Sequence, residues 1–437
     1  MIFLFSICTF IFYLSTFSLV KASDDHDHYH HHHDHHHQRD VQVTKRDNDF
    51  IAAAWYAGWH QDTSPSFDTS DVSWEKYTHM IYSFAVPTQN VSQLSLDGSD
   101  GEKLPQFVQT AHQNNVKALI AIGGWAGSIY FSSAVGSAEN RTAFVKTLTD
   151  FTTTYGLDGI NFDWEYPNKQ GIGCNVINAN DAVNFLAFLQ ELRQDPVGAK
   201  LSLSAATGIA TFNGPSGTPL ADVTGFAQVL DFIAIMNYDV WGSWSATVGP
   251  NSPLADSCAS SENQQGSAAT AVKNWNGAGM PLDKIVLGVA SYGHSFVVSH
   301  DNAFANGSDS ELAAYPPFDK SAFPRGDSWD GDAGPDACGN HEPSGGTYNF
   351  WGLINNGFLD QNGDFLDSIP HRFDSCSQTP YVYNPDSNIM VSFDNAQSFT
   401  SKGKFIQGAG LKGFAMWEAG GDSNDILLDA VSAGMRE

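Results

Sequence analysis

Three polar side chains alternate along one short stretch of the chain: Asn161, Asp163 and Glu165, in the sequence LDGINFDWEYP. Alternate residues of a β-strand point to the same face, so these three share one face while Phe162 and Trp164 point the other way. Two carboxylates held side by side resist ionising together, which raises the pKa of one and keeps it protonated beside an ionised partner. Cleavage of a glycosidic bond requires such a pair.

The same residues allow two other interpretations. Three polar side chains at a strand end can simply meet water, but these lie in an apolar run flanked by aromatic residues, where burial without a partner is costly. Asp163 and Glu165 are also possible metal ligands, but no His or Cys at ligand spacing accompanies them. We therefore expect no metal and no cofactor at this site.

The strand that carries these residues is one of eight apolar runs that alternate with helix-like segments from residue 51 onward. The runs are IAAAWYAGW, HMIYSFA, VKALIAIGG, LDGINFDWE, KLSLSAA, LDFIAIMNYD, KIVLGVASYG and LKGFAMWE. Near-continuous hydrophobicity is typical of parallel strands covered on both faces, and eight such strands predict an α/β fold, a closed (β/α)8 TIM barrel. An open doubly wound sheet is the alternative, but it needs a Gly-rich turn where this chain has WYAGWHQD.

One connection between the runs is much longer than the others. Successive runs are about 30 to 50 residues apart, whereas about 115 residues separate the seventh run, which ends near Gly293, from the eighth, which starts near Leu411. We assign the catalytic barrel to residues 47–296 and 393–437. A small α+β insertion domain, residues 297–392, is expected between strand 7 and helix 7, and its Gly, Pro and Asp content predicts much loop.

The first 46 residues have the composition of segments that are removed during export. An apolar stretch followed by small residues indicates a signal peptide over residues 1–22, with a signal anchor as the alternative because no basic residue precedes it. Residues 23–46 hold nine of the 16 histidines and end in Lys45-Arg46, which favours a cleaved pro-segment over a metal-binding tract. We expect a secreted protein, extracellular or in the cell wall, without membrane attachment after maturation.

Charge and cysteine content narrow the partners and the compartment. A formal net charge of −27 repels phosphate groups, so nucleic acids and anionic membranes are poor partners, whereas a neutral polysaccharide is indifferent to it. Besides Cys8 in the signal, four cysteines suit two disulfides in an oxidising compartment, with three possible pairings. We predict the pairs Cys174–Cys258 and Cys338–Cys376. Glycosylation sequons, which agree with export, occur at Asn90, Asn140 and Asn306.

The motif DGINFDWE is similar to DGxDxDWE, the signature of glycoside hydrolase family 18, the chitinases. The resemblance extends over nearly the whole mature chain. The segment MNYDVWG at 236–242 resembles the family's M-x-Y-D, SYGHSF at 291–296 resembles its Y-G-R-S-W, and FAMWE resembles the end of its eighth strand. A long insertion after the seventh strand is also a feature of one branch of this family.

The resemblance implies a retaining, substrate-assisted mechanism. Glu165 would protonate the glycosidic oxygen while the acetamide carbonyl of the sugar at subsite −1 attacks its own anomeric carbon and forms an oxazolinium. Asp163 would bind the acetamide N–H and stabilise the positive charge. Tyr238 would bind the carbonyl, and Asp239 would support that contact.

The resemblance also implies which residues bind the sugar. Trp417 would form the floor of the pocket, since a flat aromatic face suits the apolar face of a pyranose. Tyr56 and Met236, at the ends of strands one and six, are expected in the walls. Trp125 follows the third strand and is expected at a further subsite. Other tryptophans are candidates for subsites or for packing: Trp59, Trp241 and Trp351.

Three positions depart from the family pattern. Asn161, which we place among the substrate-binding residues, stands where the family usually has Asp, so a carboxylate is missing beneath Asp163. Ala121 replaces the Ser of S-x-G-G, and His294 replaces the Arg of Y-G-R. Because Asp163 and Glu165 remain, we expect activity with a shifted pH profile.

The predicted function is hydrolysis of β-1,4 bonds between N-acetylglucosamine units, with chitin or chitooligosaccharide as the partner of a monomeric enzyme. A non-catalytic chitin-binding lectin is the alternative outside the enzyme class, but such proteins typically lose the acid found here as Glu165. An endo-β-N-acetylglucosaminidase acting on N-glycans is the alternative enzyme. The insertion after the seventh strand favours a deep groove for a long chitin chain, and so favours the chitinase.

Overall fold

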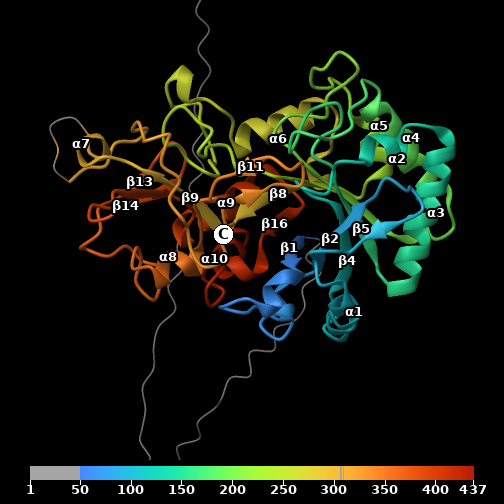
Figure 1. The fold of residues 1–437 in the computed structure, drawn as a ribbon, viewed down its shortest axis with the longest axis horizontal. Helices are drawn as coiled ribbons and strands as arrows, with labels where there is room; N and C mark the ends of the chain where they lie inside the picture. Colours follow the sequence, from blue (N-terminus) through green and yellow to red (C-terminus); the bar gives the residue numbers. More distant parts are fainter. Residues whose placement is uncertain (1–49, 306–307, 309) are drawn as a thin grey trace, which may run out of the picture. The chain divides into compact units, whose positions relative to one another are not determined.

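The computed structural model describes residues 50–305, 308 and 310–437 of the chain (Figure 1). The predicted signal peptide, the His-rich segment with Lys45-Arg46 and the sequon at Asn306 lie outside the described residues. Among the residues that are described, no helix combines the length and the apolar character needed to span a membrane.

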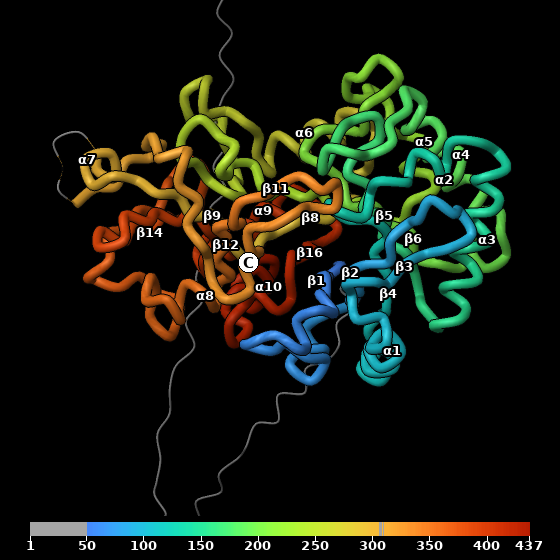
Figure 2. The backbone as a smooth tube through the Cα atoms, viewed as in Figure 1, coloured from blue at the N-terminus to red at the C-terminus, as the bar shows by residue number. Residues whose placement is uncertain are grey.

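Within the described residues, eight parallel strands close into a barrel, because β1 pairs with both β16 and β2. Figure 2 shows β1, at the blue start of the described chain, beside the red β16. The barrel strands are β1 (Ile51–Ala57), β2 (His79–Pro87), β4 (Lys117–Gly123), β5 (Gly159–Asp163), β6 (Ser202–Thr207), β7 (Phe232–Ile235), β8 (Ile285–Ala290) and β16 (Gly413–Trp417). Each of the eight apolar runs forms one of these strands, so the TIM-barrel prediction is confirmed.

Helices cover the outside of the barrel, and Figure 1 shows α2 to α5 outside β4 and β5. The α-helices of the barrel are α1 (Leu104–Gln113), α2 (Phe131–Val135), α3 (Ala138–Tyr155), α4 (Asp181–Gln194), α5 (Thr224–Val229), α6 (Ala268–Gly277), α9 (Ala396–Ala409) and α10 (Ile426–Gly434). Short 3-10 turns join them: η1 (Gly58–Asp62), η2 (Trp74–Lys76), η3 (Gly101–Lys103), η4 (Gly198–Lys200), η5 (Ser261–Asn263), η6 (Leu282–Lys284) and η7 (Ala419–Gly421). A two-residue strand, β3 (Leu94–Ser95), pairs with the end of β2.

The two faces of each barrel strand enter different hydrophobic cores. Ala53 and Trp55 of β1 belong to the inner core, where small side chains such as Ala234 and Ala415 leave room for a few large ones. Tyr56, one residue further, belongs to the outer core between strands and helices. Because both faces are apolar, the hydrophobic pattern of the strand identifies it without revealing which residues face inward.

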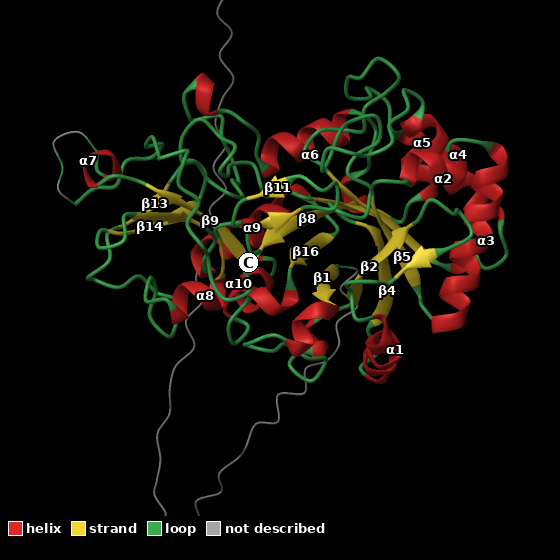
Figure 3. Cartoon of the chain, in the orientation of Figure 1, coloured by secondary structure: helices red, strands yellow, loops and turns green. Residues whose placement is uncertain are grey.

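The long connection between β8 and α9 forms a second, antiparallel sheet in the order β12-β9-β15-β14-β13. Figure 3 shows β13 and β14 of this sheet away from the barrel strands. Its elements are β9 (Tyr292–Val297), α7 (His300–Ala303), β10 (Gly334–Pro335), β11 (His341–Glu342), β12 (Thr347–Asn349), α8 (Phe350–Asn355), β13 (His371–Asp374), β14 (Thr379–Asn384) and β15 (Ile389–Ser392). The first strand of this sheet, β9, begins at Tyr292, and the last one along the chain, β15, ends at Ser392.

The cysteine pairing differs from the prediction. The structure joins Cys174 to Cys338 and Cys258 to Cys376, with Cα–Cα distances of 5.7 Å in both pairs. Each disulfide links a loop of the barrel, after β5 or after β7, to the insertion domain. The predicted pairs, Cys174–Cys258 and Cys338–Cys376, joined neighbours along the sequence and were wrong because the insertion folds back against these loops.

Candidate functional site

A cavity of about 1020 Å3 opens at the carboxyl ends of the barrel strands. Every barrel strand except β8 contributes to its lining, either directly or through the loop that follows it. The residues that matter below are Trp55, Trp59, Phe84, Gly123–Gly127, Asp163, Glu165, Tyr166, Gly208–Asn213, Met236, Tyr238, Asp239 and Trp417. A site at this end of the barrel is where the fold commonly places its chemistry.

Asp163 is the last residue of β5, and Glu165 follows two residues later. Both side chains line the cavity and are almost fully buried, with exposed fractions of 4% and 9%. Phe162 and Trp164 point the other way, into the outer core between strands and helices. The predicted separation of polar and aromatic side chains is therefore found in the structure.

The backbone around these two residues is fixed from several directions. The Glu165 N–H donates to Ser128 Oγ at 2.9 Å, and Asn175 Nδ2 donates to the Glu165 carbonyl at 2.7 Å. Gly123, at φ +110°, passes so close that an added Cβ would lie 2.2 Å from the Asp163 carbonyl. A side chain at Gly123 would thus displace β5 or β4, the strand that ends at Gly123. The position of the acid is set by packing as well as by hydrogen bonds.

Burial dominates the electrostatics of the carboxylate pair. It raises the pKa of Asp163 to about 7. Burial also raises the pKa of Glu165 well above its ordinary range, and repulsion from Asp163 adds to this while a hydrogen bond with Tyr166 opposes it. Asp163 Oδ1 is buried without a hydrogen-bond partner among the described residues. Both shifts favour a protonated carboxyl in this pair at a pH at which an exposed carboxyl would be ionised.

Tyr238 and Asp239 also line the cavity, in the segment that follows β7. Burial, followed by the nearby carboxylates of Asp163, Asp239 and Glu165, raises the pKa of Tyr238 well above 10, so its phenol remains a hydrogen-bond donor. Asp239 Oδ1 accepts from Tyr292 Oη and lies against the His294 Nε2 atom, each at 2.7 Å.

The backbone at Asp239 has a φ of +54°, a left-handed conformation that is unusual for a residue with a side chain. Its N–H donates to Asn251 Oδ1 at 2.8 Å. The Asn251 amide in turn donates to the Tyr292 carbonyl at 3.0 Å, so one side chain bridges the end of β7 and the start of the insertion domain. These contacts stabilise the left-handed turn that aims Tyr238 and Asp239 at the cavity.

Trp417 lines the cavity, as predicted, and packs against two other aromatic rings. Its ring centroid lies 5.6 Å from that of Phe84, stacked, and 6.0 Å from that of Trp55, edge-on. The next residue, Glu418, is fixed through its backbone N–H, which donates to Ser291 Oγ at 2.8 Å, and through its side chain, whose Oε1 lies 3.0 Å from His60 Nε2. The floor of the cavity therefore rests on a buried polar support.

The wall residue of β1 was predicted incorrectly. Tyr56 is fully buried in the outer core, where its ring packs on Phe107 and Tyr82, and it lies outside the cavity lining. Trp55 lines the cavity in its place, because adjacent residues of a strand face opposite sides. Met236 does line the cavity, as predicted.

Asn161 also lies outside the lining and is a correction to the predicted binding residues. It is fully buried below Asp163, where its Oδ1 accepts from Trp55 Nε1 at 3.3 Å and its Nδ2 donates to Ser204 Oγ at 2.9 Å. Ala121 is equally buried in the inner core. His294 occupies the position expected for Arg and faces Asp239.

The tryptophans expected at further subsites fall into two groups. Trp59 and Trp125 line the cavity, and Trp125 is 51% exposed. Trp241 is buried against Tyr315, and Trp351 packs on Trp329, both outside the lining.

Trp244, which the sequence analysis did not name, is 62% exposed and packs edge-on against His294 at 5.4 Å, outside the cavity lining. Its distance from the motif MNYD, only a few residues, was the available signal.

Among the described residues, no cluster of three or more His, Cys, Asp or Glu side chains is arranged to bind a metal ion. The cavity brings together what glycoside cleavage requires: a buried acid, a carboxylate beside it, a phenol donor and an aromatic floor. Its lining carries few charges for its size, which suits a neutral ligand with several sugar rings.

The chain is similar in sequence and in fold to known proteins. The sequence model of a family described as glycosyl hydrolases family 18 matches residues 52–422. A chitinase-like effector of Moniliophthora roreri is 54% identical over 384 residues, which cover 88% of this chain and 92% of that protein. A chitinase-like effector of Moniliophthora perniciosa is 53% identical over 386 residues, covering 88% and 87%. A crystal structure of a chitinase from Rhizomucor miehei matches with a TM-score of 0.78 at 31% identity, covering 88% of this chain and all of that one.

Proposed function

The chain belongs to family 18 of the glycosyl hydrolases, and we propose that it hydrolyses the β-1,4 bonds of chitin and chitooligosaccharides, with Glu165 as the catalytic acid. The observation that carries this proposal is the buried carboxylate pair at the base of the cavity, in which burial and Asp163 raise the pKa of Glu165. The Rhizomucor miehei protein, which is similar over its whole length, is a chitinase.

In the first step Glu165 donates its proton to the glycosidic oxygen, and the bond to the anomeric carbon breaks. The acetamide oxygen of the same sugar attacks that carbon and forms an oxazolinium, so the protein supplies no covalent nucleophile. Water then attacks the anomeric carbon and breaks its bond to the acetamide oxygen, which restores the acetamide; the proton of the water goes to Glu165, and the product retains its configuration. Because Glu165 must hold its proton near neutral pH, its raised pKa suits the first role.

Asp163 and Tyr238 act on the acetamide group. The unpartnered Oδ1 of Asp163 is available to accept the acetamide N–H, and the ionised carboxylate stabilises the positive oxazolinium beside it. The Tyr238 phenol, protonated because of its raised pKa, donates to the acetamide oxygen. Asp239 completes this side of the cavity.

The aromatic residues bind the sugar rings. Trp417 offers a flat face for the sugar that carries the reacting acetamide, supported by Phe84 and Trp55. Trp59 and Trp125 extend the apolar surface along the cavity, which fits an oligosaccharide better than a single sugar. Chitin and its oligomers are therefore the proposed substrates, with endo-β-N-acetylglucosaminidase activity on N-glycans as the alternative within the enzyme class.

A second candidate function is the binding of chitin oligomers without cleavage. Two relatives at 54% and 53% identity are named chitinase-like effectors. The amide of Asn161 below Asp163 also removes a carboxylate that the family pattern places there, and with it one site through which a proton can be passed. Retention of Glu165 favours the enzyme.

The deciding experiment measures hydrolysis of chitin oligomers by the mature protein and by Glu165→Gln, from about pH 3 to about pH 8, with product lengths recorded. Loss of the acid should lower kcat by about 10²–10⁴-fold. A high-mannose glycoprotein, tested in parallel, distinguishes the endo-β-N-acetylglucosaminidase. Wild-type protein that binds the oligomers but never cuts them would contradict the enzymatic proposal and support the binding protein.

We further propose that the mature protein is a secreted monomer, in the extracellular space or the cell wall. Its two disulfides are compatible with an oxidising compartment. Asn90 and Asn140 remain the proposed glycosylation sites. Asn90 is exposed in a loop, whereas the Asn140 side chain is half-buried and donates to the Ser133 carbonyl at 2.8 Å, so Asn90 is the better acceptor.

A further inference from the structure

A fully buried ion pair lies behind the cavity, between the barrel and the insertion domain. The side chains of Lys402 in α9 and of Asp394, which follows β15, are both 0% exposed, and Lys402 Nζ lies 2.6 Å from Asp394 Oδ1. Burial raises the pKa of Asp394 and lowers that of Lys402, and the attraction between them opposes both shifts. Neither residue lines the cavity, so the roles described above leave this pair unexplained.

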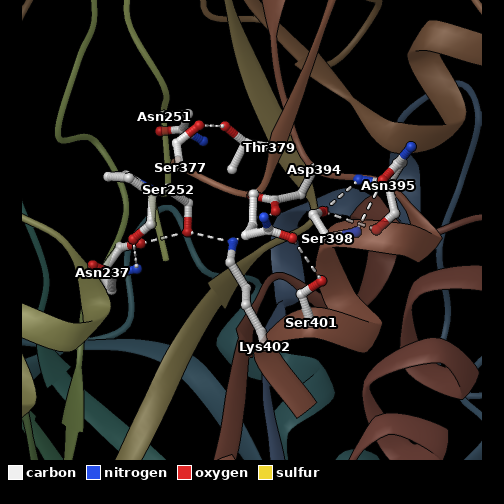
Figure 4. A network of polar contacts seen from close by, with 12 residues as sticks. Asn237, Asn251, Ser252, Ser377, Thr379, Asp394, Asn395, Ser398, Ser401 and Lys402 are labelled. Atoms are coloured by element: carbon white, nitrogen blue, oxygen red, sulfur yellow. Dashed lines mark hydrogen bonds and ion pairs between the residues drawn. The ribbon is translucent and has the colours of Figure 1, made fainter. Parts of the chain in front are cut away.

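The lysine reaches the backbone beside the proposed substrate-binding residues through a single serine. Lys402 Nζ donates to Ser252 Oγ at 2.7 Å, and Ser252 Oγ donates to the Asn237 carbonyl at 2.5 Å. Figure 4 shows the lysine side chain extended towards Ser252, with Asn237 next to the serine. Asn237 directly precedes Tyr238 and Asp239 in the chain.

The neighbours of Ser252 contact the same short segment. Asn251 Oδ1 accepts the N–H of Asp239 at 2.8 Å, and the Pro253 carbonyl accepts from Asn237 Nδ2 at 3.1 Å. Three consecutive residues, 251 to 253, therefore contact residues 237 and 239 through three hydrogen bonds, one from each residue. Because all three are buried, this contact excludes water and permits little movement.

Stability alone is a weak reason for such a pair. Transfer of two charges from water into a protein interior costs about as much as their attraction returns, so apolar side chains of similar volume stabilise a fold equally well. The lysine does something that an apolar residue cannot, because it gives Ser252 an ionic donor and leaves the serine proton directed at the Asn237 carbonyl. A charged donor makes a stronger and more directional bond than a neutral one.

We propose that Lys402 and Asp394 form a positioning pair, which acts through Ser252 to fix the turn at 237–239 and so to place Tyr238 and Asp239 against the acetamide of the substrate. The inference rests on the proposed function, since it assigns the pair to the acetamide step. Lys402 is then the link between α9, which follows the insertion domain, and the reacting group. One hydrogen bond joins Lys402 to Ser252, 150 residues earlier in the chain, and a second joins Ser252 to Asn237.

The test uses the full mature protein and the variant Ser252→Ala, which removes the link without leaving a charge unpaired. Misplacement of a positioning group by a fraction of an ångström should lower kcat by about tenfold or more while KM changes by less than about twofold. The affinity for a chitobiose thiazoline, whose fused ring copies the oxazolinium, should fall by about the same factor as kcat. The affinity for a plain chitooligosaccharide should change little.

Two further variants separate positioning from stability. The double variant Lys402→Met with Asp394→Asn removes both charges together and should show the same loss in kcat. It also serves as the test variant if Ser252→Ala fails to fold. Thr152→Val is the matched control, because it removes a buried hydroxyl that donates to a carbonyl within α3, remote from the cavity. It should lower the melting temperature to a similar extent and leave kcat unchanged.

The outcomes distinguish this inference from the proposed function. Wild-type kcat and thiazoline affinity in Ser252→Ala, or an equal loss in Thr152→Val, would show that the network serves stability alone and would overturn the inference. If the wild type binds but does not hydrolyse oligomers, the enzymatic function fails, and the thiazoline affinities of wild type and variant still decide the inference. Wild-type protein that neither cuts nor binds the thiazoline overturns both.

Discussion

Replacement of Asp163 by Asn should shift the alkaline limb of the pH–rate profile towards lower pH. Glu165 must be protonated to act as an acid, so activity is lost as pH rises through its pKa, and Asp163 is one of the causes that raise that pKa. The negative charge of Asp163 opposes ionisation of Glu165 and so contributes to the raised pKa of that residue. The neutral Asn removes this repulsion, and the pKa of Glu165 falls.

The size of the shift follows from the spacing of the two residues along the chain. Two residues of extended backbone span about 6.6 Å, which we take as the separation of the two charges. At that distance, and with an effective dielectric constant of about 20, two unit charges repel by about 2.5 kcal/mol. One pKa unit corresponds to about 1.4 kcal/mol, so the limb should move by about two pH units. Loss of the charge that stabilises the oxazolinium should also lower kcat by about 10²–10³-fold.

The assay is kcat/KM for a fluorogenic chitobioside between about pH 3 and pH 10. Asp422→Asn is the matched control, because Asp422 is another buried carboxylate, near the start of α10 and outside the cavity lining. It should leave the alkaline limb in place. An alkaline limb that stays fixed in Asp163→Asn, or moves to higher pH, would refute the proposed repulsion between the two carboxylates.

Two further predictions concern stability. Burial raises the pKa of Asp163 to about 7 and that of Asp422 to about 6, so the folded state binds protons that the unfolded chain releases. The stability that these two carboxyls contribute is complete below the ordinary Asp pKa of about 4 and is lost as the pH rises through 6 and 7. The melting temperature, measured by calorimetry, should therefore fall as the pH rises from about 4 to about 7. A rise in the melting temperature would contradict the two pKa shifts. Removal of the Cys174–Cys338 disulfide by paired Ser substitutions should lower the free energy of unfolding, measured by urea titration, by roughly 3–5 kcal/mol. The reason is that this disulfide closes a loop with a sequence separation of 164 residues. An unchanged free energy of unfolding would show that the insertion domain is fixed to the β5 loop without the disulfide.

The motif around Glu165 was predictable because its geometry is local. Alternation along a single strand places Asp163 with Glu165 and separates them from Phe162 and Trp164, whatever the rest of the fold does. The eight apolar runs were equally clear, since parallel strands covered on both faces are hydrophobic throughout.

The same property explains the error at β1. In a strand with two apolar faces, composition does not show which residues face the barrel interior, so Tyr56 was assigned to a wall that Trp55 forms. Asn161 was misplaced for a related reason. It lies on the correct face, but one layer deeper than the cavity, and depth along the barrel axis depends on the register between β5 and its neighbours.

The sequence by itself determined the barrel, the strand that carries the acid and the identity of the paired carboxylates, because each depends on residues that are close along the chain. Only the tertiary structure decided the disulfide pairs, the aromatic wall and the path from Lys402 through Ser252 to Asn237. These join segments more than a hundred residues apart, and their contacts depend on how the insertion domain folds back onto the barrel. No local pattern records that arrangement, because it results from the packing of the whole chain.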